Sequence, residues 1–114
     1  MKKTGIMYIE EKPDRLKEPA RIGRMRFSKT GKSIYYRGRL FRSLKGSGFK
    51  ANYFDAETGA EFWISGCKKN GNDQLYGGTT TIDDDVREEY WLKIRELPER
   101  VHHKTIRDQG KYGR

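Results

Sequence analysis

The sequence predicts a mainly β protein, a small antiparallel sheet or open barrel of five to six strands with one C-terminal α-helix. Three observations support this fold class. Short segments rich in aromatic and β-branched residues alternate polar and apolar side chains. Glycine-containing turns separate these segments at short intervals. Among all segments, residues 82–97 alone show the apolar spacing of an amphipathic helix.

The length and composition fit a single domain. The chain has 114 residues, of which 33% are hydrophobic and 36% are charged. This length allows one modest core and excludes large two-domain enzymes. We expect one β-rich domain over residues 1–99, with its helix at 83–97, and a basic, flexible tail over residues 100–114. No apolar run approaches the roughly 20 residues of a membrane span, so we expect no membrane partner.

The first hairpin is the best-defined β element. Arg21–Phe27 and Ser33–Phe41 are predicted as two strands, joined by a turn in which Gly31 adopts a positive φ. Side-chain alternation then places one apolar set on a common face, namely Met25, Phe27, Ile34, Tyr36 and Leu40. Ile22 falls out of phase with this face, which indicates a bulge at Gly23.

Other strands are predicted on both sides of this hairpin. Tyr8–Glu11 forms a short first strand. Lys50–Phe54 and Ala60–Ser65 form a second hairpin around a turn at residues 55–59, and Gln74–Tyr76 forms a last short strand. We expect the aromatic residues of the second hairpin to fall on both of its faces. One face of the sheet would then remain aromatic and open to a protein partner.

The predicted helix has a clear apolar stripe and clear ends. Val86, Tyr90, Ile94 and Leu97 share one side, and Trp91 lies at its edge. Asp83 and the two acidic residues after it are expected to cap the helix and to complement its dipole. Pro98 is expected to end it.

The positive charge is concentrated in one part of the chain. The net charge is +9, and residues 20–50 contain ten basic residues and no acidic one. The hairpin alignment places basic and aromatic side chains on the outer face and at the tip, and we expect them to be exposed and without carboxylate partners. These candidate binding residues are Arg24, Arg26, Lys29, Lys32, Tyr35, Arg37, Arg39 and Phe41.

A basic sheet face with an aromatic side chain is typical of proteins that bind single-stranded nucleic acid, where bases stack and cations hold the backbone. The pattern therefore favours binding of RNA or single-stranded DNA. An ordinary solvated face explains the arginines equally well. The alternative function is a protein-interaction or regulatory module, including a homodimer.

Residues that would carry catalysis do not converge in this sequence. Cys67 is the single cysteine, and His102 and His103 lie in a polar segment without further metal-ligand spacing. Gly31-Lys32-Ser33 lacks the earlier glycine of a phosphate-binding loop, because that position is Arg26. We expect no enzyme activity, no cofactor and no metal. The single cysteine favours the cytoplasm.

Several segments resemble a group of small bacterial proteins that often carry the label 1-deoxy-D-xylulose-5-phosphate synthase. They are Ala20–Arg24, Phe27–Lys32, Tyr35–Arg39, Leu44–Asp55, Phe62–Gly66 and Ile82–Trp91. The enzyme of that name binds thiamine diphosphate through a Gly-Asp-Gly motif, which this chain lacks, and it is far larger. The resemblance therefore implies a cytoplasmic bacterial protein and supplies no catalytic residue.

Overall fold

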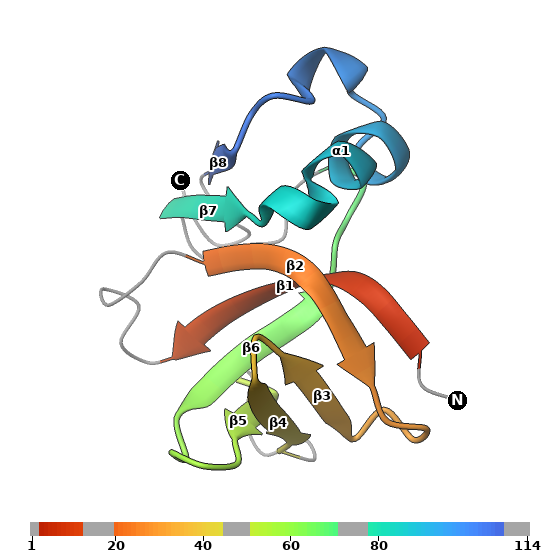
Figure 1. Cartoon of the computed structure of the whole chain (residues 1–114). Helices are drawn as coiled ribbons and strands as arrows, with labels where there is room; N and C mark the ends of the chain where they lie inside the picture. Colours follow the sequence, from red (N-terminus) through yellow and green to blue (C-terminus); the bar gives the residue numbers. More distant parts are fainter. Residues whose placement is uncertain (1–2, 13–19, 45–50, 71–77, 109–114) are drawn as a thin grey trace.

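A computed structural model describes residues 3–12, 20–44, 51–70 and 78–108. Its main feature is a closed barrel of six antiparallel strands, each hydrogen-bonded to the next in the chain, with the sixth paired to the first (Figure 1). The strands are β1 (Lys3–Lys12), β2 (Ala20–Phe27), β3 (Ser33–Tyr36), β4 (Arg39–Ser43), β5 (Tyr53–Asp55) and β6 (Glu61–Gly66). The predicted mainly β fold is confirmed, and the barrel is closed rather than open.

The long first strand closes the barrel. Residues 3–9 of β1 pair with β2, and residues 7–12 pair with β6, so this one strand connects the second strand of the barrel to the sixth. The expected first strand, Tyr8–Glu11, covers only the second half of β1. Its first half contains Gly5, and the Phe27 ring of β2 lies 3.3 Å from the place of a Cβ atom there. A glycine with a weak strand preference therefore lies where β2 approaches closely.

Two further strands extend the sheet beyond β2. β7 (Gly78–Ile82) runs parallel to β2, and β8 (Thr105–Asp108) pairs antiparallel with β7. β8 lies within residues 100–114, which we expected to form a flexible tail, and all four of its residues pair with β7. The predicted strand Gln74–Tyr76 and residues 109–114 lie outside the described residues.

The C-terminal helix is shorter and less regular than the predicted helix 83–97. It consists of a 3₁₀ turn η1 (Asp84–Val86), a single α turn α1 (Arg87–Glu89) and a π turn η2 (Tyr90–Ile94). Glu96 has a φ of 57° and ends the helix, and the Leu97 N–H donates to the Trp91 carbonyl at 2.8 Å. This bond spans one residue more than the corresponding bond of a Schellman motif, because the preceding turn is a π turn. A second 3₁₀ turn, η3 (Pro98–Arg100), follows.

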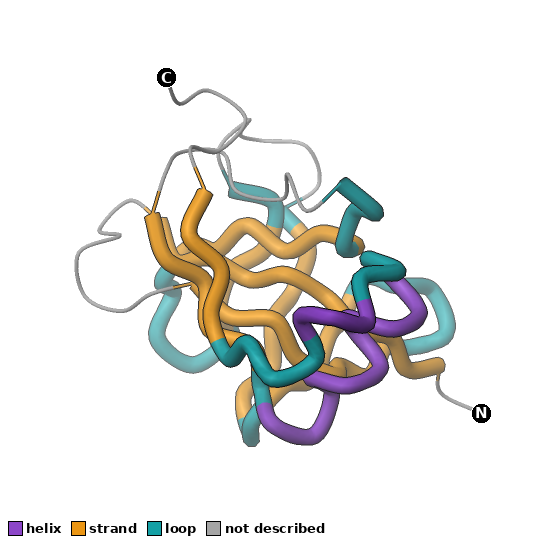
Figure 2. Tube along the Cα trace, turned by 90° about the horizontal axis from the view of Figure 1, so that it is seen from above, coloured by secondary structure: helices purple, strands orange, loops and turns teal. Residues whose placement is uncertain are grey.

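Two hydrophobic clusters lie on opposite sides of the barrel wall. The inner cluster fills the barrel with Ile9, Met25, Ile34, Tyr36, Phe41, Phe62 and Ile64. The outer cluster contains Tyr8, Ile22, Ile82, Val86, Tyr90 and Trp91, where the helical segment lies across the strands (Figure 2). Neighbouring residues of one strand therefore enter different clusters. Trp63 packs against the outer cluster, so it does not form the open aromatic face that we expected.

The outer cluster explains why Ile22 of β2 does not share a face with the other apolar residues of the hairpin. Ile22 is 1% exposed because it points toward the helical segment, whereas Met25 points into the barrel. No bulge is needed, since the β1–β2 register is continuous through Gly23. Gly23 is required for space, because a Cβ atom there would overlap Asp83 Oδ2 and would lie 2.6 Å from Tyr36 Cε1.

Gly23→Ala is therefore expected to destabilise the fold by about 1–3 kcal/mol through overpacking, with a lower denaturation midpoint. Gly66→Ala is the matched control within a strand, because nothing lies within 4 Å of the place of its Cβ atom. Equal midpoints for the two variants would show that Asp83 and Tyr36 do not hold their positions against β2.

Candidate nucleic-acid interface

A tight turn at Arg37-Gly38 reorganises the predicted interface. Both residues have positive φ, 51° and 77°, as in a two-residue type I′ hairpin turn. The predicted single strand Ser33–Phe41 is therefore wrong, since β3 and β4 fold back on each other and Tyr36 pairs with Arg39. Paired residues share a face, so Arg39 lies on the inner face of the sheet with Tyr36, at the end of the barrel, and not on the outer face with Arg37.

On β2 and β3, the side chains that we predicted for the outer face of the first hairpin do lie on that face. Arg26 pairs across the strands with Tyr35, and its guanidinium lies 5.8 Å from the centroid of that ring. Arg24 is on the same face and donates to Glu89 of α1 at 2.6 Å. The side chains of this ion pair are partly exposed to solvent, 38% for Arg24 and 40% for Glu89. Water and salt therefore weaken the pair.

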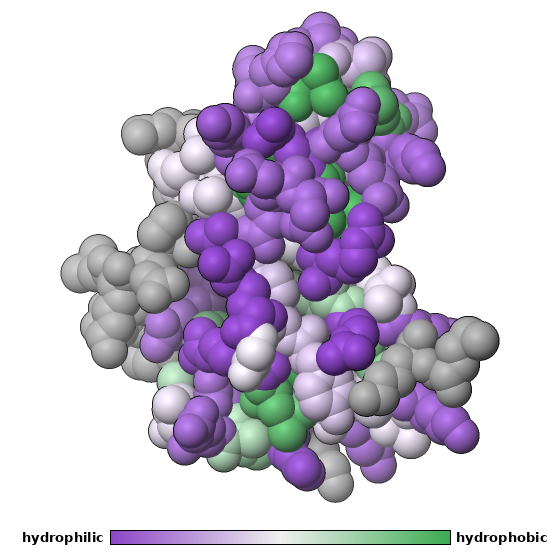
Figure 3. Space-filling view, viewed as in Figure 1, coloured by the Kyte–Doolittle hydropathy of each residue, from purple (hydrophilic) through white to green (hydrophobic). Residues whose placement is uncertain are grey.

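Next to this face lies a surface groove of about 340 Å³. None of the described residues that line it is acidic. Four arginines and a tyrosine of the predicted set line it, namely Arg24, Arg26, Tyr35, Arg37 and Arg39. Figure 3 shows strongly hydrophilic surface across this part of the molecule, between the barrel and the helical segment. We call this feature the outer groove.

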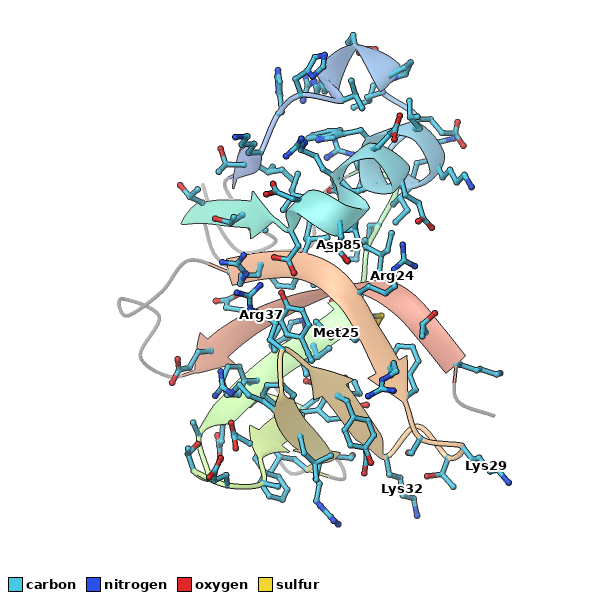
Figure 4. All side chains as sticks on the ribbon, in the orientation of Figure 1. Arg24, Met25, Lys29, Lys32, Arg37 and Asp85 are labelled. Carbon is cyan, nitrogen blue, oxygen red and sulfur yellow. The ribbon has the colours of Figure 1, made fainter. Side chains whose placement is uncertain are left out.

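The other predicted residues lie elsewhere. Phe41 is fully buried in the inner cluster, so the expected position on the outer face is wrong. Its change of side follows from the Arg37-Gly38 turn. Lys29 and Lys32 are exposed at the tip of the β2–β3 connection, away from Arg24 and Arg37, and do not line the outer groove (Figure 4). Gly31 has the predicted positive φ, 77°.

The end of the barrel beside the Arg37-Gly38 turn contains a buried polar cluster that the sequence analysis did not predict. Arg21 donates to Asp83 Oδ1 from Nε and Nη2, at 3.0 and 2.7 Å. The Tyr36 hydroxyl donates to Asp83 Oδ2 at 2.6 Å. Burial and this hydrogen bond raise the pKa of Tyr36 to about 12, so the hydroxyl keeps its proton at neutral pH. Asp83 uses both oxygens here, and its side chain does not cap the helix as expected.

A second carboxylate holds Arg39. Asp55 Oδ2 accepts from Arg39 Nε at 2.7 Å, and Oδ1 accepts from the backbone N–H groups of Glu57 and Thr58. Burial alone would raise the pKa of Asp55, but these hydrogen bonds outweigh it and lower the pKa below its usual value. The Arg39 guanidinium also lies over the Phe62 and Phe41 rings, 4.9 and 5.2 Å from their centroids.

These side chains surround a cavity of about 270 Å³ at the end of the barrel. We call it the barrel mouth. It is lined by Ile9, Glu11, Arg21, Tyr36, Arg37, Arg39 and Phe62. It shares Tyr36, Arg37 and Arg39 with the outer groove, so the two depressions adjoin at the β3–β4 turn.

The expectation of unpaired arginines is wrong for three of the four central ones. Arg24 pairs with Glu89, Arg39 pairs with Asp55, and Arg37 lies 3.7 Å from Asp83. A closed barrel causes this, because it brings residues distant in the sequence to one end. The polar mouth residues outside the predicted set are Glu11, Arg21 and Tyr36. Recognition of Arg37-Gly38 as a turn would have placed Arg39 opposite Tyr36, on the inner face, whereas Glu11 and Arg21 reach the mouth through barrel closure.

Comparisons with known proteins do not indicate a function for this chain. No family model, curated protein or solved structure was found to match the chain. Within the described ranges, no three His, Cys, Asp or Glu residues are grouped as metal ligands would be. In the same part of the chain, no helix is long and apolar enough to cross a membrane.

The Asp55 contacts predict how stability depends on pH. A carboxylate with a lowered folded pKa contributes stability above its unfolded pKa, and this contribution is lost as the pH falls through the folded value. Asp55→Asn should cost about 1–3 kcal/mol at pH 7, from the loss of charged hydrogen bonds. The variant should also lose less stability than the wild type between about pH 5 and pH 2.

Chemical denaturation across this pH range measures both effects. Glu57→Gln is the control in the same turn, because the Glu57 side chain is exposed. A pH profile of Asp55→Asn that is parallel to the wild-type profile would contradict the role of Asp55.

Proposed function

We propose that the protein is a non-enzymatic, small basic domain that binds single-stranded nucleic acid, RNA or DNA, through the outer groove. The observation that carries this proposal is the lining of the groove, with four arginines, two tyrosines and no acidic residue among the described ones. The proposal places the protein in the cytoplasm, which suits a chain with a single cysteine.

The arginines of the groove suit a phosphate backbone. A guanidinium offers forked donors that match two phosphate oxygens. Arg26 has no carboxylate partner among the described residues, and Arg24 has an exposed one that a phosphate can replace. At Arg24 the replacement exchanges one solvated ion pair for another, so the free-energy change there is small and binding depends on several contacts together.

Tyr35 supplies the aromatic component. It lies on the outer face opposite Arg26 and lines the groove between the arginines. A partly exposed ring at this place can stack on a base of any identity. The alternative of a protein-interaction module has less support, because Leu92, at 41%, is the one large hydrophobic residue of the described part that is classed as exposed.

Removal of two groove arginines tests the proposal. If Arg24 and Arg26 each contact one phosphate, the double variant Arg24→Ala, Arg26→Ala should weaken binding of a single-stranded oligonucleotide. The slope of log affinity against log salt concentration should fall by about 1.4, since each contact on a single strand contributes about 0.7. Fluorescence anisotropy at several salt concentrations measures both quantities.

The matched control removes two positive charges elsewhere. Lys69→Ala, Arg100→Ala changes exposed side chains outside β2, β3 and β4, and neither residue lines the outer groove. It should leave the salt slope unchanged. An equal loss of slope in both double variants would mean that net charge alone attracts the nucleic acid. The proposal fails if the wild type does not bind at low salt.

Tyr35 should contribute in a different way. Tyr35→Ala is expected to cost about 1–3 kcal/mol of binding free energy through lost stacking, with little change in salt slope. Tyr35→Phe retains the ring and should bind as the wild type does. If Tyr35→Phe loses as much affinity as Tyr35→Ala, the ring does not stack on a base, and the hydroxyl carries the effect.

A further inference from the structure

The barrel mouth has a closed floor. Ile9 and Phe62 line the cavity and belong to the inner cluster, where they are 6% and 4% exposed. The interior below them is filled by the remaining inner-cluster side chains. A polymer cannot pass through a filled barrel, so this cavity can accept a small group or the end of a chain. Its volume of about 270 Å³ is below that of most drug-sized pockets.

Two arginines of the mouth retain unused donors. Arg39 donates from Nε to Asp55, and among the described contacts its two Nη groups make no hydrogen bond. The two rings beneath its guanidinium keep that group in place. The side chain of Arg37 is 57% exposed, and its 3.7 Å approach to Asp83 is longer than a hydrogen bond. The mouth therefore presents two adjacent guanidinium groups to an incoming anion.

The backbone at Arg37 is a second, independent indication. Its φ of 51° lies in the left-handed region, and two-residue turns of this type favour Asn, Asp or Gly at this position. An arginine therefore costs conformational energy here. Non-glycine residues in such conformations are concentrated at functional sites. Arg37 also lines both the mouth and the outer groove, so it stands where a strand in the groove would reach the cavity.

We propose that the barrel mouth binds the terminal phosphate of the nucleic-acid strand that occupies the outer groove. This inference rests on the proposed function. A terminal phosphate carries nearly two negative charges and three strong acceptor oxygens, whereas a phosphate inside the strand carries one charge. Two neighbouring guanidinium groups match the terminal form better, because each takes a pair of oxygens. The closed floor then stops the strand at its end.

Glu11 limits the affinity of this site. Its carboxylate lines the cavity and repels an anion, while the arginines attract it. The neutral variant Glu11→Gln should therefore strengthen the preference for a terminal phosphate. This direction is opposite to that of any variant that merely damages the fold.

The experiment compares three forms of one oligonucleotide of about twelve nucleotides, a length within the range that small single-strand binding domains cover. One form has a 5′-phosphate, one has a 3′-phosphate, and one has hydroxyl groups at both ends. Each form competes with a labelled strand for the wild-type protein. One phosphorylated form should bind about tenfold more tightly than the hydroxyl form, or better, as expected for added charged hydrogen bonds.

Arg37→Asn should reduce this ratio to near one while the denaturation midpoint stays the same or rises, because Asn suits the turn. The double variant Arg24→Ala, Arg26→Ala should weaken binding of all three forms and leave the ratio unchanged. Equal wild-type affinity for the three forms would overturn this inference and leave the proposed function standing. The absence of binding for every form at low salt would overturn both.

Discussion

The carboxylate of Asp83 joins the end of the barrel to the start of the helical segment. Oδ1 accepts from Arg21 at the start of β2, and Oδ2 accepts from Tyr36 at the end of β3. The backbone N–H of Asp83 donates to the Ile22 carbonyl at 2.8 Å, directly beside Gly23. Asp83 is only 8% exposed, so its charge is tolerated because these donors replace water. The helical segment begins at the next residue and is therefore fixed against the end of the barrel.

Closure of a six-stranded barrel decides where charged residues can lie. The side chains of the inner cluster fill the barrel, so inward-facing residues are apolar along most of each strand. At the ends of the strands, an inward-facing side chain lies beyond the core and reaches solvent at the barrel mouth. Arg21, Arg39 and Glu11 are inward-facing residues of this kind, and the alternation of each strand places them around one mouth. Charged side chains gather at this end because the strands extend beyond the apolar core.

Local patterns allowed the β2–β3 turn, the turn at residues 55–59 and the apolar side of the helix to be predicted. Val86, Tyr90 and Trp91 are buried as their spacing indicates, and Arg26 faces Tyr35 as the alternation indicates. Features that depend on distant contacts were missed. β7 and β8 have few apolar residues and are stable because they extend an existing sheet. The Arg37-Gly38 turn was missed because type I′ turns usually have Asn, Asp or Gly at their first position, and arginine there did not indicate a turn.

The burial of each ion pair separates the arginines that build the fold from those that can bind. Arg21 is bonded to the buried carboxylate of Asp83, and a phosphate could take Arg21 only if it left that carboxylate buried without this partner. Arg24 is bonded to a carboxylate that is 40% exposed, and that carboxylate returns to water when a phosphate replaces it. Arg37 and Arg39 lie between these cases, because their side chains are more than 40% exposed while their carboxylate partners are buried. A phosphate at the mouth would therefore join these pairs without breaking them, which makes the site selective for the more highly charged end of a strand.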